Sequence, residues 1–307
     1  MSNLQSIKKR ISNTQNVGKI TKTMEMVAAV KMRHAQQIAL ASRPYALAAL
    51  DLFGRLSVVS EELPPILRPR PIQGALFLLV ASDKGLAGAF NSAVIRKFEQ
   101  YSSQNPAVPG NRYAAVGEKA GKYLARKKYP VARKFSGVAE YASLEQTRPI
   151  SDYIVAGYLA GEWDRVMVFS MHFRSALKQE PLVRELLPVS LKSVTDAIDS
   201  IIPETGKFAE ERRKTGEEVS LPANYLIEPS ASRVLEHVVE HLLHAQLYHV
   251  VVESNAAEHS ARRAAMKMAS DNAHDLQETL TLQYNKARQA AITKEIIEIS
   301  AGAEALS

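Results

Sequence analysis

The chain has 307 residues, of which 46% are hydrophobic, and it carries a formal net charge of +7 at pH 7. Its length is sufficient for two domains, and the absence of cysteine excludes disulfides, a thiolate nucleophile and a cysteine-based zinc site. The longest apolar run, residues 75–81, is far shorter than the roughly 20 residues that span a bilayer. We therefore expect any membrane association to be peripheral.

The N-terminal segment is basic. Between Met1 and Arg43, eight Lys or Arg residues stand against a single acid, Glu25, so this stretch alone accounts for the net charge. Such a segment favours an acidic partner, either a nucleic acid or an acidic protein surface. It contains no aromatic residue before Tyr45 and no recognised nucleic-acid-binding motif, which disfavours nucleic acid.

The same segment is patterned as a helix. Its apolar residues recur at steps of three and four, with one shift of phase: Leu4, Ile7 and Ile11, then Val17, Ile20, Met24 and Val27. Gly18 is the only helix breaker before Pro44, which gives a helix of roughly 60 Å within an N-terminal shaft segment, residues 1–62. The phase shift argues against a long ideal heptad seam.

The middle of the chain alternates strands and helices. We expect strands at residues 74–82, 112–117 and 164–173, and helices at residues 91–100, 118–128 and 149–161. This alternation predicts a central α/β domain, residues 74–202, whose sheet is at least partly parallel. The polar stretch 203–224 is typical of a mobile loop, within a connector that ends at residue 229.

The C-terminal segment, residues 230–307, predicts one long helix. Residues 231–301 contain neither Gly nor Pro, and Pro229 and Gly302 flank them. At 1.5 Å per residue such a helix would be roughly 105 Å long. Small or apolar residues recur at helical spacing along it: Leu235, Val238, Leu242, Ala257, Ala261, Ala264 and Met268.

Two terminal helices that each carry an apolar stripe are most simply paired with each other as an antiparallel coiled coil. Seven alanines between residues 256 and 273 would permit their close approach. The final stretch, residues 285–306, differs because alanine and isoleucine occur all round the helix. A chain end is usually polar and frayed, so this composition favours a partner that buries the tip.

A glycine-containing loop, "SDKGLAGAFN" at residues 82–91, follows the first expected strand and opens a helix, where phosphate-binding loops occur. Only Gly85 and Gly88 are present, so the loop lacks the three glycines of a dinucleotide fingerprint and the GK[ST] ending of a P-loop. We therefore favour a tight strand-to-helix turn over a nucleotide site, and expect no cofactor.

Three histidines, His237, His241 and His244, share one face of the long helix, with Glu240 nearby. Two of them could hold a metal, but the HExxH order is absent, which favours solvated or packed histidines and no metal site. No Ser/His/Asp grouping or carboxylate pair occurs at meaningful local spacing, so we expect no catalytic residues.

Four stretches resemble one family, the γ subunit of bacterial F-type ATP synthases. They are "RISNTQNVGKITKTMEMVAAVKM" (10–32), "SDKGLAGAFN" (82–91), "VVESNAAEHSARRAAMKMASDNA" (251–273) and "YNKARQAAITKEIIEISAGAEAL" (284–306). The last stretch is the most specific, and the resemblance is weaker from about residue 100 to 220. It implies a long antiparallel coiled coil of the N- and C-terminal helices with a central Rossmann-like α/β domain.

In function, the resemblance implies the central rotor shaft, a non-catalytic subunit of the proton-translocating ATPase. Rotation of the membrane c ring, driven by ions, would be coupled through the shaft to ATP synthesis or hydrolysis at the β subunits. The implied partners are the α and β subunits, the ε subunit and the c ring, with one copy of the shaft per complex and no nucleic acid. The expected location is peripheral, on the cytoplasmic face of a bacterial inner membrane.

The resemblance also suggests contact residues. Arg288, Gln289 and Thr293 would meet the α and β loops that grip the shaft, and Ile296 and Ile297 would lie in their apolar collar. The basic segment and Lys84 would face an acidic lever segment of β.

Tyr225 and Glu228 would touch the c ring, unless they are a strand end packed on its own domain. Two other functions stay open at this point: a nucleotide-using α/β enzyme, and a coiled-coil adaptor that binds nucleic acid.

Overall fold

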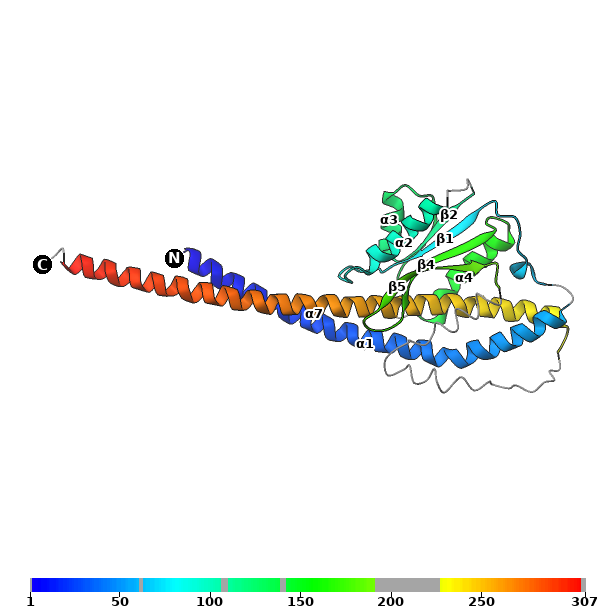
Figure 1. Cartoon of the computed structure of the whole chain (residues 1–307), viewed down its shortest axis with the longest axis horizontal. Helices are drawn as coiled ribbons and strands as arrows, with labels where there is room; N and C mark the ends of the chain where they lie inside the picture. The colour runs from blue at the N-terminus through cyan, green and yellow to red at the C-terminus, as the bar shows by residue number, and fades with distance from the viewer. Residues whose placement is uncertain (1, 61–62, 106–109, 139–141, 191–226, 305–307) are drawn as a thin grey trace. The chain divides into compact units, whose positions relative to one another are not determined.

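The computed structural model describes residues 2–60, 63–105, 110–138, 142–190 and 227–304 (Figure 1). Its contacts divide the chain into two units, Met1–Ala28 with Arg262–Ser307, and Ala29–Ala261. Both divisions fall inside long helices, so each unit contains part of α1 (Ser2–Val59) and part of α7 (Ala231–Glu304). The segments expected from the sequence have other boundaries and stay a prediction.

The long C-terminal helix begins where the sequence predicts. Ser230 precedes α7 and caps it. Its side-chain oxygen accepts a hydrogen bond from the Arg233 amide, and its carbonyl oxygen accepts one from the Val234 amide. The expected interruption at Pro44 is wrong, since α1 continues through this residue to Val59. Phe53 and Leu56, both buried beyond it, pack the helix firmly enough to offset the hydrogen bond that proline removes.

The central sheet confirms the predicted α/β class. Its strands are β1 (Ala75–Val80), β2 (Arg112–Val116), β3 (Val131–Phe135), β4 (Arg165–Phe173) and β5 (Gln179–Leu187), in the order β3-β2-β1-β4-β5. The first four run parallel, and β5 pairs antiparallel with β4. The helices between them are α2 (Phe90–Gln104), α3 (Glu118–Arg126) and α4 (Leu144–Leu159), and a 3-10 turn (η1, Pro65–Leu67) precedes β1.

Both edge strands, β3 and β5, were not expected from the sequence. β3 reads "VARKF" and is largely exposed, and β5 reads "QEPLVRELL" with most of its side chains half-buried. An edge strand needs only one apolar face, and that face can be short, so neither stretch shows the continuous apolar run of β1.

Both faces of β1 are covered. Leu76, Leu78 and Val80 belong to a buried cluster that includes residues of α4, α1 and α7. Phe77 and Leu79 point to the other face and belong to a cluster with α2 and α3. Burial on both faces explains why this strand is apolar along its whole length.

Within Ala29–Ala261, α1 and α7 run antiparallel and are joined by a buried polar contact. Ser42 Oγ of α1 lies 3.0 Å from His249 Nε2 of α7. The Ser42 hydroxyl also donates to the carbonyl of Ala39, so His249 Nε2 carries the proton in this contact. Burial lowers the pKa of His249 to about 4, although nearby Glu253 opposes the shift.

This histidine predicts an acid-dependent loss of stability. Between pH 6.5, the ordinary His pKa, and about 4, the unfolded chain binds a proton that folded His249 does not. The free energy of unfolding should therefore fall as pH falls through this window, by up to about 3 kcal/mol, and this contribution should level off below it. Urea unfolding at pH 4 to 8 should show a smaller slope for His249→Gln, and an unchanged slope would contradict the assignment.

Candidate coupling surfaces

In the unit formed by Met1–Ala28 and Arg262–Ser307, the two helices pack along a regular seam. Buried or half-buried residues follow a strict seven-residue repeat on α1: Leu4, Ile7, Ile11, Thr14, Gly18, Thr21, Glu25 and Ala28. The matching repeat on α7 is Met266, Ser270, Ala273, Gln277, Leu280, Tyr284, Ala287 and Ala291. Gly18 faces Ala273, because a Cβ built on Gly18 would lie 3.5 Å from that of Ala273. Two such repeats are the pattern of a coiled coil.

The expected phase shift is therefore wrong. Of the four residues expected in the resumed apolar stripe, Met24 is half-buried, but the exposed fractions of Val17, Ile20 and Val27 are 49–59%. Thr14, Gly18 and Thr21 take the seam positions instead, and they continue the register set by Leu4, Ile7 and Ile11. Small and hydroxyl-bearing residues suit the seam because they let the two backbones approach.

The α7 stripe is corrected in the same way. Ala264 and Met268 were expected to face a partner helix but are exposed, and Met266 and Ala273 are buried in their place.

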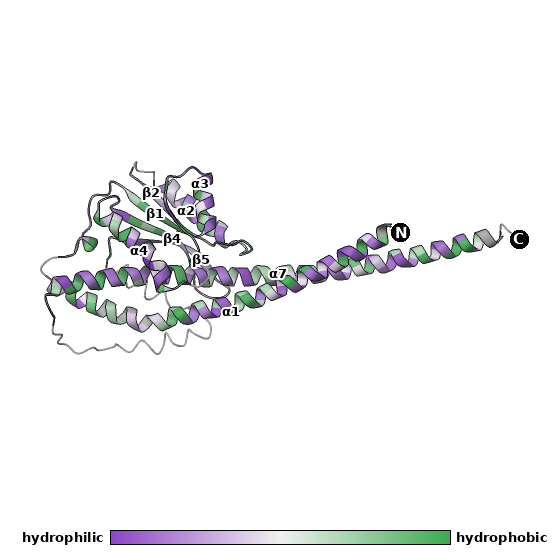
Figure 2. Cartoon of the chain, turned by 180° about the vertical axis from the view of Figure 1, so that it is seen from behind, coloured by the Kyte–Doolittle hydropathy of each residue, from purple (hydrophilic) through white to green (hydrophobic). Residues whose placement is uncertain are grey.

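Outside the seam, this unit exposes many large apolar side chains. They are Val17, Ile20, Met26 and Val27 on α1, and Met268, Leu276, Leu282, Ile292, Ile296, Ile297 and Ile299 on α7. Figure 2 shows hydrophobic residues recurring among hydrophilic ones along the ends of both helices. A surface of this kind marks a site where another protein binds.

The end of α7 carries most of the predicted contact residues. The seam ends at Ala291, and Arg288, Gln289, Ile296 and Ile297 are all exposed. Thr293 is also exposed, but its hydroxyl donates to the carbonyl of Gln289 at 2.9 Å, within the same helix. The tip thus combines aliphatic side chains with a few polar groups, which is suitable for a largely apolar partner surface.

The loop at residues 82–91 is closed by its own side chains. Asn91 Oδ1 accepts from the Ser82 amide at 3.0 Å and from the Ser82 hydroxyl at 2.9 Å. The Asp83 carboxylate accepts from the amides of Glu118, at the start of α3, and Gly137. These side chains occupy donors that a phosphate would need, so the geometry favours a tight turn, and Lys84 is exposed on it.

The three histidines His237, His241 and His244 of α7 line one groove of about 260 Å³ with α4. Within it, His244 contacts the Ser151 hydroxyl through Nδ1, while His237 and His241 are exposed. Among the described residues, no group of three or more His, Cys, Asp or Glu could hold a metal ion.

Glu228 is exposed just ahead of α7, and Tyr225 lies outside the described residues. No helix in the described part of the chain is long and apolar enough to cross a membrane.

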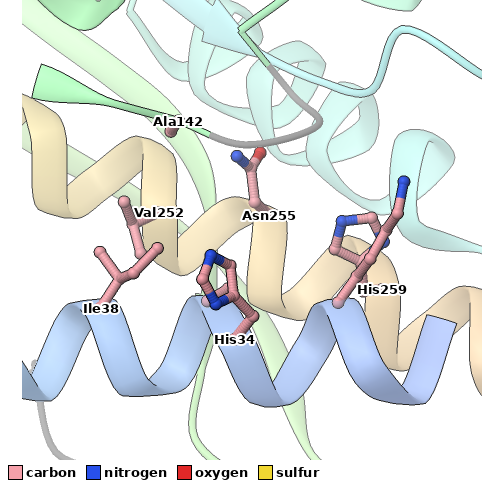
Figure 3. A pocket seen from close by; sticks show the side chains of 8 residues that line it. His34, Ile38, Ala142, Val252, Asn255 and His259 are labelled. Atoms are coloured by element: carbon pink, nitrogen blue, oxygen red, sulfur yellow. The ribbon is translucent and has the colours of Figure 1, made fainter. Parts of the chain in front are cut away.

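The burial of α7 within the unit Ala29–Ala261 was not expected from the sequence. Every residue from Val250 to Ser260 is buried except Glu253, which is half-buried, so this part of α7 is enclosed on all sides. Figure 3 shows His34 and Ile38 of α1 pointing toward Val252 and Asn255 of α7. They line a pocket of about 10 Å³, room for a single water molecule.

Three comparisons bear on identity. A family model described as ATP synthase matches residues 3–306. The ATP synthase gamma chains of a Picosynechococcus species and of Synechococcus elongatus are 37% and 38% identical to the chain, over the full length of both partners.

Two solved structures share the fold. One is a chain in the structure of the central stalk and c ring of the Tetrahymena thermophila mitochondrial ATP synthase. Its match to this chain has a TM-score of 0.59 and 21% sequence identity, and it covers 82% of this chain and 99% of that one. A chain from the Euglena gracilis mitochondrial enzyme has a TM-score of 0.65 and 16% identity, covering 99% and 95%.

The seam assignment predicts different effects for two leucines of α7. Leu280 is 2% exposed and Leu282 is 72% exposed. Leu280→Ala should destabilise the helix pair by about 2 kcal/mol or more, whereas Leu282→Ala should change stability by less than about 0.5 kcal/mol. Thermal unfolding of the isolated chain, followed by helical circular dichroism, measures both. Equal effects would contradict the seam register.

Proposed function

Because the chain belongs to the ATP synthase γ-chain family, we propose how its surfaces meet the other subunits of that complex. As a member of this family it is the central rotor shaft. It couples ion-driven rotation to ATP synthesis or hydrolysis and is a non-catalytic subunit. ATP synthase is a membrane-associated complex, so the chain is a peripheral subunit of it. The resemblance noted in the sequence analysis is confirmed.

The tip of α7 is proposed to turn inside a collar formed by the α and β subunits. Its exposed isoleucines, Ile292, Ile296, Ile297 and Ile299, support this, because a free chain end would not be expected to carry them. Apolar contacts depend little on orientation, so such a tip can be buried and still turn. This exposed apolar tip is the observation that carries the proposal.

Polar residues beside the tip are proposed to grip the collar at defined angles. Arg288, Gln289 and Thr293 lie at or beyond the end of the seam, where α1 covers the helix least. Thr293 already bonds within its helix, so Arg288 is the strongest candidate of the three. Its planar guanidinium can bind a carboxylate or two carbonyls at once.

The basic face of α1 is proposed to meet an acidic lever segment of β. Lys8, Lys9, Arg10 and Lys19 are all exposed, beside the exposed Val17 and Ile20. Charge would guide the approach of an acidic segment, and the apolar residues would hold it. Lys84 is proposed to act with them.

The unit Ala29–Ala261, which contains the sheet, is proposed to contact the ε subunit and the c ring. One copy of the shaft is proposed per complex. Glu228 is exposed and available for such a contact, and Tyr225 is proposed beside it from the sequence alone. The segments 1–62, 74–202, 203–229 and 230–307 are proposed as the functional divisions. We place the complex at the cytoplasmic face of a bacterial inner membrane.

The proposed assembly can be tested directly. The tagged chain, purified from its native membranes, should bring α, β and ε subunits and the c ring with it. A chain with Ile296→Asp and Ile297→Asp should retain ε and lose most of α and β, because each buried isoleucine contributes roughly 1.5–3 kcal/mol. Full retention of α and β by that variant would contradict the collar.

The gripping role of Arg288 has a matched control in Lys286, which is also exposed on α7 but is two residues away. Arg288→Ala should lower ATP hydrolysis by the assembled complex about 5- to 10-fold, equivalent to the loss of about 1 kcal/mol of specific binding. Lys286→Ala should leave the rate within about twofold, because a solvated lysine loses little. Equal rates for the two variants would remove the case for a specific contact at Arg288.

A further inference from the structure

We propose that Glu253 locks α7 to the central sheet, so that the helix cannot turn or slide in its seat when the rotor works against a load. The proposal rests on the rotor function above. It makes Glu253 a positioning residue, with His172 and Arg184 as its partners on the sheet.

The three side chains form a network between α7 and the strands β4 and β5. Glu253 Oε2 lies 2.9 Å from an Arg184 guanidinium nitrogen, and Oε1 contacts His172 Nδ1. The Phe173 amide donates to the same Oε1 at 3.3 Å. Arg184 also lies 3.2 Å from His172 Nδ1, a nitrogen that can donate to Glu253 or accept from Arg184 but not both.

The network is shielded from water. The side chains of Glu253, His172 and Arg184 are only 11–15% exposed. Hydrogen bonds to charged groups are stronger than those between neutral groups, and removing one partner of a buried pair leaves the other charge uncompensated. The contact therefore resists any movement that separates its two sides.

The surroundings of Glu253 explain why such a contact is needed. Its neighbours Val250, Val251, Val252, Ala256 and Ala257 are all buried. Apolar contacts hold a helix in place but depend weakly on its rotation, and small side chains give a smooth surface. Directional bonds from Glu253 to the sheet therefore add a resistance to rotation that these apolar contacts give only weakly.

Several neutral hydrogen bonds also join this part of α7 to its surroundings. Asn255 donates to the carbonyl of Val138 at 3.4 Å, and Ser260 donates to that of Ala176 at 2.8 Å. Gln179 of β5 donates to Ser260 at 3.1 Å. They act in the same direction as Glu253, which joins α7 to β4, to β5 and to a backbone amide through a charged side chain.

Glu253→Gln is the direct test, in the whole ATP synthase. Glutamine keeps the shape and can still accept from the Phe173 amide, but it loses the charge that holds Arg184. The matched control is Glu185→Gln. Glu185 pairs with Arg165 at 2.6 Å between the same two strands, without contact to α7 in the network described.

Two rates are measured on reconstituted vesicles: ATP hydrolysis with an ionophore present, and ATP-driven ion pumping against a rising gradient. In Glu253→Gln, hydrolysis should stay within about twofold of the intact enzyme. The number of ions pumped per ATP should fall at least about threefold when the opposing gradient is large. Under that load, slipping of α7 against the sheet is easier than rotation of the c ring. Glu185→Gln should match the intact enzyme in both, and Glu253→Asp, which keeps the charge, should recover part of the pumping.

Each other outcome counts against the lock. Full pumping by Glu253→Gln at every load would show that the contact carries no torque. Failure of Glu253→Gln to assemble, with Glu185→Gln assembling, would assign Glu253 to folding instead. If the intact chain itself neither assembles with ATP synthase subunits nor supports pumping, the proposed function fails rather than the lock.

Discussion

The burial of α7 between Val250 and Ser260 is the constraint on which the rest of the unit Ala29–Ala261 depends. There α1 packs on one side of the helix and the clusters of the sheet pack on others. Six of the eleven residues are polar, and a buried polar group needs a partner inside the fold. Glu253, Asn255 and Ser260 bond to a strand or loop of the same unit and are among the points that define the position of the helix.

In the unit formed by Met1–Ala28 and Arg262–Ser307, most of the surface of α7 is exposed instead of buried. There the seam uses one narrow stripe, and the remaining apolar residues are left exposed, among them Ile296 and Ile297. Exposed isoleucine is unfavourable in water, so it indicates a partner that covers it. One helix thus carries a section fixed by directional bonds and a section suited to smooth apolar contact, which is what a rotor shaft needs.

Much of the fold could be predicted from the sequence. β1 is buried on both faces and reads as a continuous apolar run, and the absence of Gly and Pro after residue 231 revealed α7. The edge strands β3 and β5 could not be found, because half-exposed strands lack such a run. The seam was misread because Thr14, Gly18 and Thr21 do not look apolar, while the exposed Val17 and Ile20 do.

The contact residues at the tip stay a prediction from the family resemblance, and the Glu253 network was not predicted at all. His172, Arg184 and Glu253 are far apart in the sequence, and only the pairing of β4 with β5 and the packing of α7 bring them together. One signal was available: a single acid directly after the run Val250–Val252. A charge beside a fully buried stretch of helix calls for a buried partner.

Hydrogen exchange of the free chain and of the assembled complex tests the central claim most directly. The account predicts that amides of residues 250–260 exchange slowly in both states, because their burial is internal to the chain. Amides of residues 292–304 should exchange fast in the free chain and slowly in the complex, because only partners cover them. Equal protection of residues 292–304 in both states, or fast exchange of residues 250–260 in the free chain, would contradict it.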